Sequence, residues 1–135
     1  MKVKWGIVLL LLCMLAALIW FRQARAHPVA EARYADEQIR MEIQAVQAVA
    51  RPMKETAFQV VLTQWPEVPI SDADLALNIT MPDMFCGVFA AEIVESEPGV
   101  YNAIAMPVMK GQWQAEAILR WEDRHITVRT LFTVR

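Results

Sequence analysis

Sulfur-bearing side chains gather in two short segments of the chain. The first segment, residues 81–87, reads Met-Pro-Asp-Met-Phe-Cys-Gly and holds two thioethers and the thiol of Cys86. The second segment, residues 106–113, reads Met-Pro-Val-Met-Lys-Gly-Gln-Trp and adds two more methionines. Soft sulfur ligands of this kind suit Cu(I), whereas Mg, Ca and Mn prefer oxygen. The pattern therefore indicates a copper(I) site built from two loops, provided that the loops meet in space.

Position relative to the predicted strands separates candidate ligands from packing residues. Met84 and Met109 fall beyond the ends of predicted strands, so we interpret both as loop ligands. Met81 continues the apolar face of the strand before it, and Met106 shares an apolar face with its neighbours. We interpret both as packing residues, since methionine fills irregular gaps well. Cys86 fits either interpretation, because free cysteines are commonly buried while a thiolate is a strong soft ligand. The candidate metal ligands are thus Met84, Cys86 and Met109.

Residue patterns that would indicate catalysis are missing from the sequence. The sequence offers no Ser/His/Asp set, no glycine-rich phosphate loop and no paired histidine spacing for zinc. A blue-copper centre needs two histidines and a cysteine around the metal. The two histidines, His27 and His125, are both far along the chain from Cys86, which disfavours such a centre. We therefore expect a protein that is not an enzyme.

Composition and charge narrow the class of partner. Hydrophobic residues make up 56% of the chain, above the usual fraction of about 45–50%. The formal net charge is -2, and four of the 13 basic residues but none of the 15 acidic residues precede His27, so the remainder of the chain is acidic. An acidic domain repels phosphate backbones, which excludes nucleic acid as an expected partner. Cys13 and Cys86 lie in different parts of the chain and predict no disulfide framework.

Residues 1–26 have the pattern of an export segment. After a basic start, the run from Ile7 to Phe21 contains no charge and no proline, and Ala24-Arg-Ala26 is a small-x-small cleavage pattern. This pattern fits a signal peptide and also a retained membrane anchor. The anchor is favoured because Trp5 and Trp20 bracket the run as interfacial aromatics do. We predict a single-pass cell-membrane protein whose domain lies outside the cytoplasm, in the periplasm or the extracellular space.

Residues 29–51 are predicted to form a helical stalk. No glycine or proline occurs between Val29 and Ala50, and apolar residues recur there at helical spacing. These residues are Ala32, Ala35, Ile39, Ile43, Val46 and Ala50. Pro52 would end the helix, because the residue before a proline is pushed out of the α region. Such a helix would pack on the domain, space it from the membrane or bind a partner.

Residues 53–135 are predicted to form a mainly β domain, because the hydrophobic period changes to two after Met53. Alternation is clearest in the last two segments, which flank the turn at residues 122–124 and predict a hairpin. Their inward residues are Trp113, Ala115, Ala117, Leu119 and Trp121, then Ile126, Val128, Thr130, Phe132 and Val134. Short strands with a turn signal about every ten residues are typical of a small antiparallel β-sandwich.

Three motifs give this domain a resemblance to a known family. Met81-Pro-Asp-Met84, Pro98-Gly-Val-Tyr101 and Met109-Lys-Gly-Gln-Trp113 resemble the pattern of the YtkA-like family of small exported domains, which is related to the FixH proteins of cytochrome oxidase assembly. The resemblance covers roughly residues 55–135 and implies an immunoglobulin-like sandwich with a copper role. Many members carry a histidine in the first loop. This chain has none there, which shifts the implied site toward sulfur ligands alone.

Two functions from different classes follow from these patterns. The first is an exported, membrane-anchored copper-binding or copper-delivery accessory protein, with Met84, Cys86 and Met109 as ligands and a copper-receiving protein as partner. The second is a metal-free interaction module that docks onto a membrane complex such as an oxidase or a transporter. Proximity of the two sulfur loops would favour the first function, and wide separation would favour the second.

Overall fold

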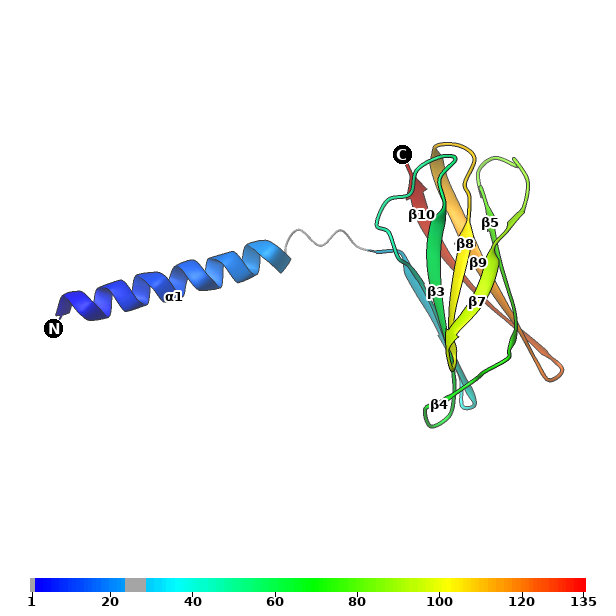
Figure 1. The fold of residues 1–135 in the computed structure, drawn as a ribbon, viewed down its shortest axis with the longest axis horizontal. Helices are drawn as coiled ribbons and strands as arrows, with labels where there is room; N and C mark the ends of the chain where they lie inside the picture. Colours follow the sequence, from blue (N-terminus) through cyan, green and yellow to red (C-terminus); the bar gives the residue numbers. More distant parts are fainter. Residues whose placement is uncertain (1, 24–28) are drawn as a thin grey trace.

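The computed structural model describes residues 2–23 and 29–135 of the chain. Within these residues there is one helix, α1 (Lys2–Gln23), followed by ten strands. The strands are β1 (Glu31–Ala35), β2 (Ile39–Ala45), β3 (Thr56–Gln64), β4 (Val68–Pro69), β5 (Asp74–Thr80), β6 (Phe89–Ala90), β7 (Glu92–Glu97), β8 (Val100–Ala105), β9 (Gly111–Trp121) and β10 (Arg124–Val134). Figure 1 shows the strands gathered into one upright body.

The strands form two antiparallel sheets that pack face to face. The first sheet has the order β1-β2-β3-β8-β7, with β4 paired to β3, and the second has the order β10-β9-β5-β6. The chain therefore crosses between the sheets after β4, β6 and β8. Two sheets with one apolar face each bury that face by stacking, which is the physical basis of a sandwich. The predicted mainly β antiparallel sandwich is confirmed.

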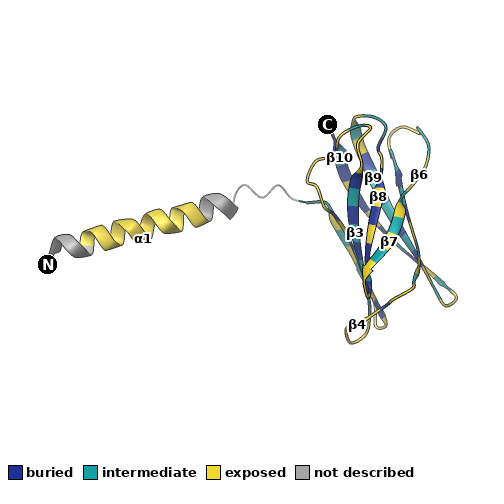
Figure 2. Ribbon diagram, in the orientation of Figure 1, coloured by how far each residue is buried: buried dark blue, intermediate teal, exposed yellow. Residues whose placement is uncertain are grey.

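The core lies between the two sheets and follows the alternation of the strands (Figure 2). The inward residues predicted for β9 and β10 are buried, with Trp121 only partly covered. Phe58 of β3 meets Phe132 of β10 edge to face, with ring centroids 5.1 Å apart. Every buried hydrophobic residue in the described part of the chain lies between Ile39 and Val134. The sandwich therefore has a core of its own and folds without α1.

The segment predicted as a helical stalk, residues 29–51, is instead a β-hairpin followed by a loop. β1 pairs with β2 in the register Glu31↔Gln44, and Arg33 reaches Glu42 across the hairpin at 3.3 Å. The helical prediction is wrong because the true period is two. Ile39, Met41, Ile43 and Ala45 are all buried, whereas the residues between them point outward. The domain consequently begins near Glu31 rather than at Met53.

Between Ile7 and Ile19, helix α1 is apolar on every side. Its large apolar side chains between Ile7 and Ile19 are exposed, including the consecutive run from Ile7 to Leu12. Among the residues that the structure describes, no helix has the combined length and hydropathy of a membrane span. The small-x-small pattern at residues 24–26 falls outside the described residues.

The connections between strands lie at two opposite ends of the sandwich (Figure 1). The loop end is formed by residues 46–55, 81–88 and 106–110 together with Arg135. The turn end is formed by residues 36–38, 65–67, 70–73, 98–99 and 122–123. Backbone hydrogen bonds join the loop end, because Met53 donates to Pro107 at 2.8 Å and Arg135 donates to Ala50 at 3.0 Å. Ala45 donates to Ala30 at 2.8 Å, so the chain also enters the sandwich at the loop end.

Candidate functional site

The pairing of β5 with β9 brings the two sulfur loops to the same end of the second sheet. The strands are antiparallel, and Thr80 at the end of β5 lies opposite Gln114 near the start of β9. Loop 81–88 therefore leaves the sheet beside the strand that loop 106–110 enters. Strand register therefore places the two loops at the same end of the second sheet, as the sequence-based hypothesis requires, and a metal site between their sulfur atoms stays a prediction.

A close approach at Gly111 links the two loops. A Cβ placed on Gly111 would lie 2.7 Å from the terminal methyl carbon of Met81, so the Met81 side chain lies directly against the first residue of β9. Gly111 also has φ of +137°, a conformation that side-chain-bearing residues rarely adopt. The backbone conformation therefore favours glycine here, and a side chain at this position would also displace the flexible end of Met81.

Trp113 fixes the backbone of the second loop. Its ring is fully buried, and its indole N–H donates to the carbonyl of Met109 at 3.0 Å. Phe89 packs against the same ring with centroids 5.8 Å apart. Trp113 was predicted to be a core residue, which is confirmed. The sequence analysis did not predict the hydrogen bond from Trp113 to Met109. The spacing of a loop methionine, a glycine two residues later and a tryptophan two residues after that is the signal that could have predicted it.

The three candidate ligands differ in exposure. Met84 is 51% exposed, whereas Cys86 and Met109 are half-buried and pack against the core. Met81 is also half-buried against the core, as its place on the inward face of β5 predicted. The interpretation of Met106 as a packing residue is wrong. Its side chain is exposed because it shares the outer face with Ile104, whereas the inner face of β8 is formed by Tyr101, Ala103 and Ala105.

The donor atoms at the loop end are mainly sulfur. Among the described residues, no group of three or more His, Cys, Asp or Glu side chains is placed to hold a metal ion. His125 lies at the opposite end, in register with Arg120. Thioethers and one thiol suit a soft cation such as Cu(I), and they do not suit Ca²⁺ or Mg²⁺, which require oxygen ligands. The residues present therefore fit copper(I) by donor chemistry.

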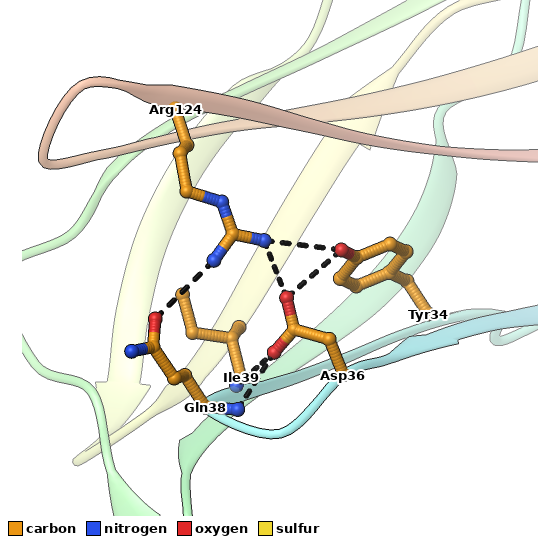
Figure 3. Close-up of polar contacts among 5 residues, drawn as sticks. All are labelled: Tyr34, Asp36, Gln38, Ile39 and Arg124. Atoms are coloured by element: carbon orange, nitrogen blue, oxygen red, sulfur yellow. Dashed lines mark hydrogen bonds and ion pairs between the residues drawn. The ribbon is translucent and has the colours of Figure 1, made fainter.

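The turn end has a different chemistry, centred on Arg124 (Figure 3). Arg124 donates to the hydroxyl of Tyr34 at 3.1 Å and to the side-chain carbonyl of Gln38 at 3.3 Å, and it pairs with Asp36. The other carboxylate oxygen of Asp36 accepts the backbone N–H groups of Gln38 and Ile39. The hydrogen bond from Arg124 and these N–H donors hold the pKa of Asp36 well below its usual range. This polar cluster joins a hairpin of one sheet to a hairpin of the other.

Comparison with known proteins bears on the fold. No model of a protein family matches the chain, and no curated protein matches it. The chain is similar to the crystal structure of a DUF4785 family protein from Legionella pneumophila, with a TM-score of 0.56 and 10% identity over 71% of this chain. The match spans only 28% of the Legionella chain.

A second solved structure, the Lin-41 filamin domain, is similar over nearly its whole length. The TM-score is 0.51 and the identity 15%, and the match covers 69% of this chain and 91% of the filamin domain. Identities this low carry information about fold alone. Together with the observed sheets, the comparison shows that residues 31–134 form one immunoglobulin-like β-sandwich.

Proposed function

We propose that the sandwich is a copper(I)-binding accessory domain with Met84, Cys86 and Met109 as its ligands. The observation that carries this proposal is the emergence of loops 81–88 and 106–110 from paired strands, with sulfur on both loops. Thioether and thiolate side chains bind Cu(I) in preference to harder cations. The motif resemblance to the YtkA-like family supports the same conclusion.

The difference in exposure among the ligands suits capture and transfer of the metal. Met84 is the most exposed of the three ligands and would meet an incoming copper ion or a copper-receiving protein first. Cys86 and Met109 are half-buried against apolar side chains, which would keep water from the bound ion. A domain with one open and two sheltered ligands is therefore suited to copper delivery.

The domain is proposed to lie outside the cytoplasm, with residues 1–26 holding it at the membrane. The basic start and the uncharged run of the sequence support this placement. A helix that is apolar on every side, as α1 is between Ile7 and Ile19, also requires an apolar environment. Extraction of membranes at alkaline pH and N-terminal sequencing of the recovered protein test this placement. Release of a chain that starts after Ala26 would identify a cleaved signal peptide instead.

The copper proposal is tested by competition titration of residues 29–135 with a chromophoric Cu(I) chelator. We expect one copper per chain, and each of Met84→Ala, Cys86→Ala and Met109→Ala should weaken binding by about tenfold or more. Met53→Ala is the matched control, because Met53 is an exposed methionine at the same end but outside both sulfur loops. The Cu(I) affinity of the Met53→Ala variant should equal that of the wild type.

Weak binding that is indifferent to the three substitutions would contradict a copper site. The exposed apolar side chains at the loop end, above all Phe85, would then favour the second candidate function. That function is a metal-free interaction module that assists a membrane complex such as an oxidase or a transporter.

A further inference from the structure

Exposed apolar side chains are concentrated at the loop end and come from all three of its loops. Phe85 is 91% exposed, and Met53 and Val88 are 62% and 60% exposed. The other members are Val46, Val49, Met84 and Met106, and we call the whole set the loop-end patch. Single exposed apolar residues are normal, but several at one end of a small domain mark a contact surface.

Charge is distributed unevenly between the two ends of the sandwich. Every charged side chain in the segments of the turn end is acidic: Asp36, Glu37, Glu67, Asp72, Glu122 and Asp123. Three arginines lie at the adjoining strand ends: Arg40 is exposed, and Arg120 and Arg124 are paired with Asp74 and Asp36. The loop end instead carries Arg51, Lys54, Lys110 and Arg135, all exposed, against Glu55 and Asp83. One end is therefore apolar and basic, and the other is acidic.

The covalent chain ties the basic, apolar end to the N-terminal segment. The carbonyl of Ala30 accepts a hydrogen bond from the backbone N–H of Ala45 at the loop end. Only residues 24–28 separate α1 from Val29. A chain of this length spans at most about 20 Å when fully extended. Wherever the end of α1 is held, Val29 at the loop end must therefore lie within about that distance of it.

From these three observations we propose that the loop end rests on an anionic lipid bilayer. The loop-end patch enters the headgroup region, with Phe85 as its main apolar anchor, and the basic side chains contact anionic headgroups. Apolar side chains flanked by lysine and arginine bind bilayer surfaces in this way. The acidic turn end is repelled by the same surface and faces solution. This inference goes beyond copper binding and rests only on the membrane placement proposed above.

A bilayer accounts for the combination of features better than a protein partner does. The patch consists of separate loop tips at the end of the sandwich, and basic residues occur on two of the three loops and at Arg135. Charge complementarity therefore favours an anionic surface. Continuity with the apolar segment of α1 favours a lipid one.

The test is cosedimentation of residues 29–135 with phosphatidylcholine vesicles prepared with and without phosphatidylglycerol. This fragment has the whole core and lacks α1, so the anchor cannot contribute to binding. We expect binding to the anionic vesicles that weakens with added salt. Phe85→Ser should weaken it by about tenfold, and Lys110→Glu by about fivefold or more.

Matched controls come from the turn end. Trp65→Ser removes a side chain that is 69% exposed there, and Arg120→Glu reverses a charge there. Neither should change vesicle binding by more than a small fraction. Val88→Ser is a second patch variant, and circular dichroism of every variant confirms that the sandwich remains folded.

Two results would overturn the proposal. The first is the absence of binding to anionic vesicles, or equal binding by Phe85→Ser and Trp65→Ser. The second is a dimer in analytical ultracentrifugation that Phe85→Ser dissociates, since a second copy would then cover the patch. Failure of the anchor would appear separately, as release of the full chain from membranes. Failure of the copper site would appear only in the chelator titration.

Discussion

At the scale of single residues, the hydroxyl of Tyr101 holds the connection between β4 and β5 in place through two hydrogen bonds. The ring is buried, and the hydroxyl donates to the carbonyl of Ile70 at 2.8 Å while it accepts the N–H of Ala73 at 3.0 Å. Both partners belong to the connection between β4 and β5, which crosses from one sheet to the other. Burial raises the pKa of Tyr101, so the hydroxyl remains protonated and able to donate.

Tyr101→Phe should destabilise the domain without changing its fold. The substitution keeps the ring but leaves a carbonyl and an N–H group at a partly buried site without their partner. We expect the free energy of unfolding to fall by about 1–3 kcal/mol. Urea denaturation at neutral pH measures this loss, and an unchanged midpoint would show that water replaces the hydroxyl at no cost.

Asp36→Asn should reveal the pH dependence that the Arg124 cluster imposes. The pKa of Asp36 is depressed in the folded state, so its carboxylate stabilises the fold fully above its ordinary pKa of about 4. That contribution is lost as the pH falls from there toward the folded-state pKa. The variant should unfold at lower urea than the wild type at pH 7, and the gap should narrow below a pH of about 4.

Asp74→Asn is the control for this measurement. Asp74 pairs with Arg120 at 3.6 Å, but both side chains are largely exposed, and such pairs contribute little. The control should remain close to the wild type at both pH values. A gap for Asp36→Asn that is equally wide in acid would contradict the role given to its charge.

At the scale of elements, the hairpin β9–β10 could be predicted from the sequence and the hairpin β1–β2 could not. In β9 and β10 the inward positions hold large residues such as Trp113, Leu119 and Phe132, and the outward positions are mostly polar. Residues 29–51 are rich in alanine, which packs acceptably on the apolar face of a helix or of a strand. The helical arc also omitted Met41, which is fully buried and marks the true period.

The candidate site could be predicted only in part from the alternation of apolar and polar residues. Loops after β5 and before β9 were expected to hold Met84 and Met109, and they do. The exposure of Met106 was not foreseen, because alternation shows which residues share a face but not which face the other sheet covers. The adjacency of the loops depends on β5–β9 pairing, and strand order cannot be deduced from alternation.

Trp113→Phe tests whether β9 positions the second sulfur loop. The variant keeps an aromatic ring in the core but removes the N–H that holds the carbonyl of Met109. On the copper proposal, we expect Cu(I) affinity to fall by about tenfold, as for the loss of a group that orients a ligand. Trp121→Phe, the same change at the turn end of β9, should leave the affinity unaltered. Equal losses in both variants would indicate general destabilisation.

At the scale of the whole molecule, the two ends of the sandwich carry different kinds of side chain. Sulfur, exposed apolar side chains and basic residues gather at the loop end, while the turn end has the acidic turns and the Arg124 cluster. Both proposals therefore concern one end of the domain. If that end rests on a bilayer, Met84 and Cys86 lie near the lipid surface, and the protein that receives copper must reach them there.

The open side of the sandwich has a consequence for crowding on a surface. The first sheet ends at β7, whose sequence is Glu-Ile-Val-Glu-Ser-Glu, and the second ends at β6, which has only two residues. A short strand and a strand rich in carboxylates are poor templates for pairing with another chain. Proteins confined to two dimensions meet one another far more often than in solution, so exposed strand edges there would favour fibre-like assembly. The edges formed by β6 and β7 therefore disfavour such assembly through this side of the sandwich when the domain is crowded on a surface.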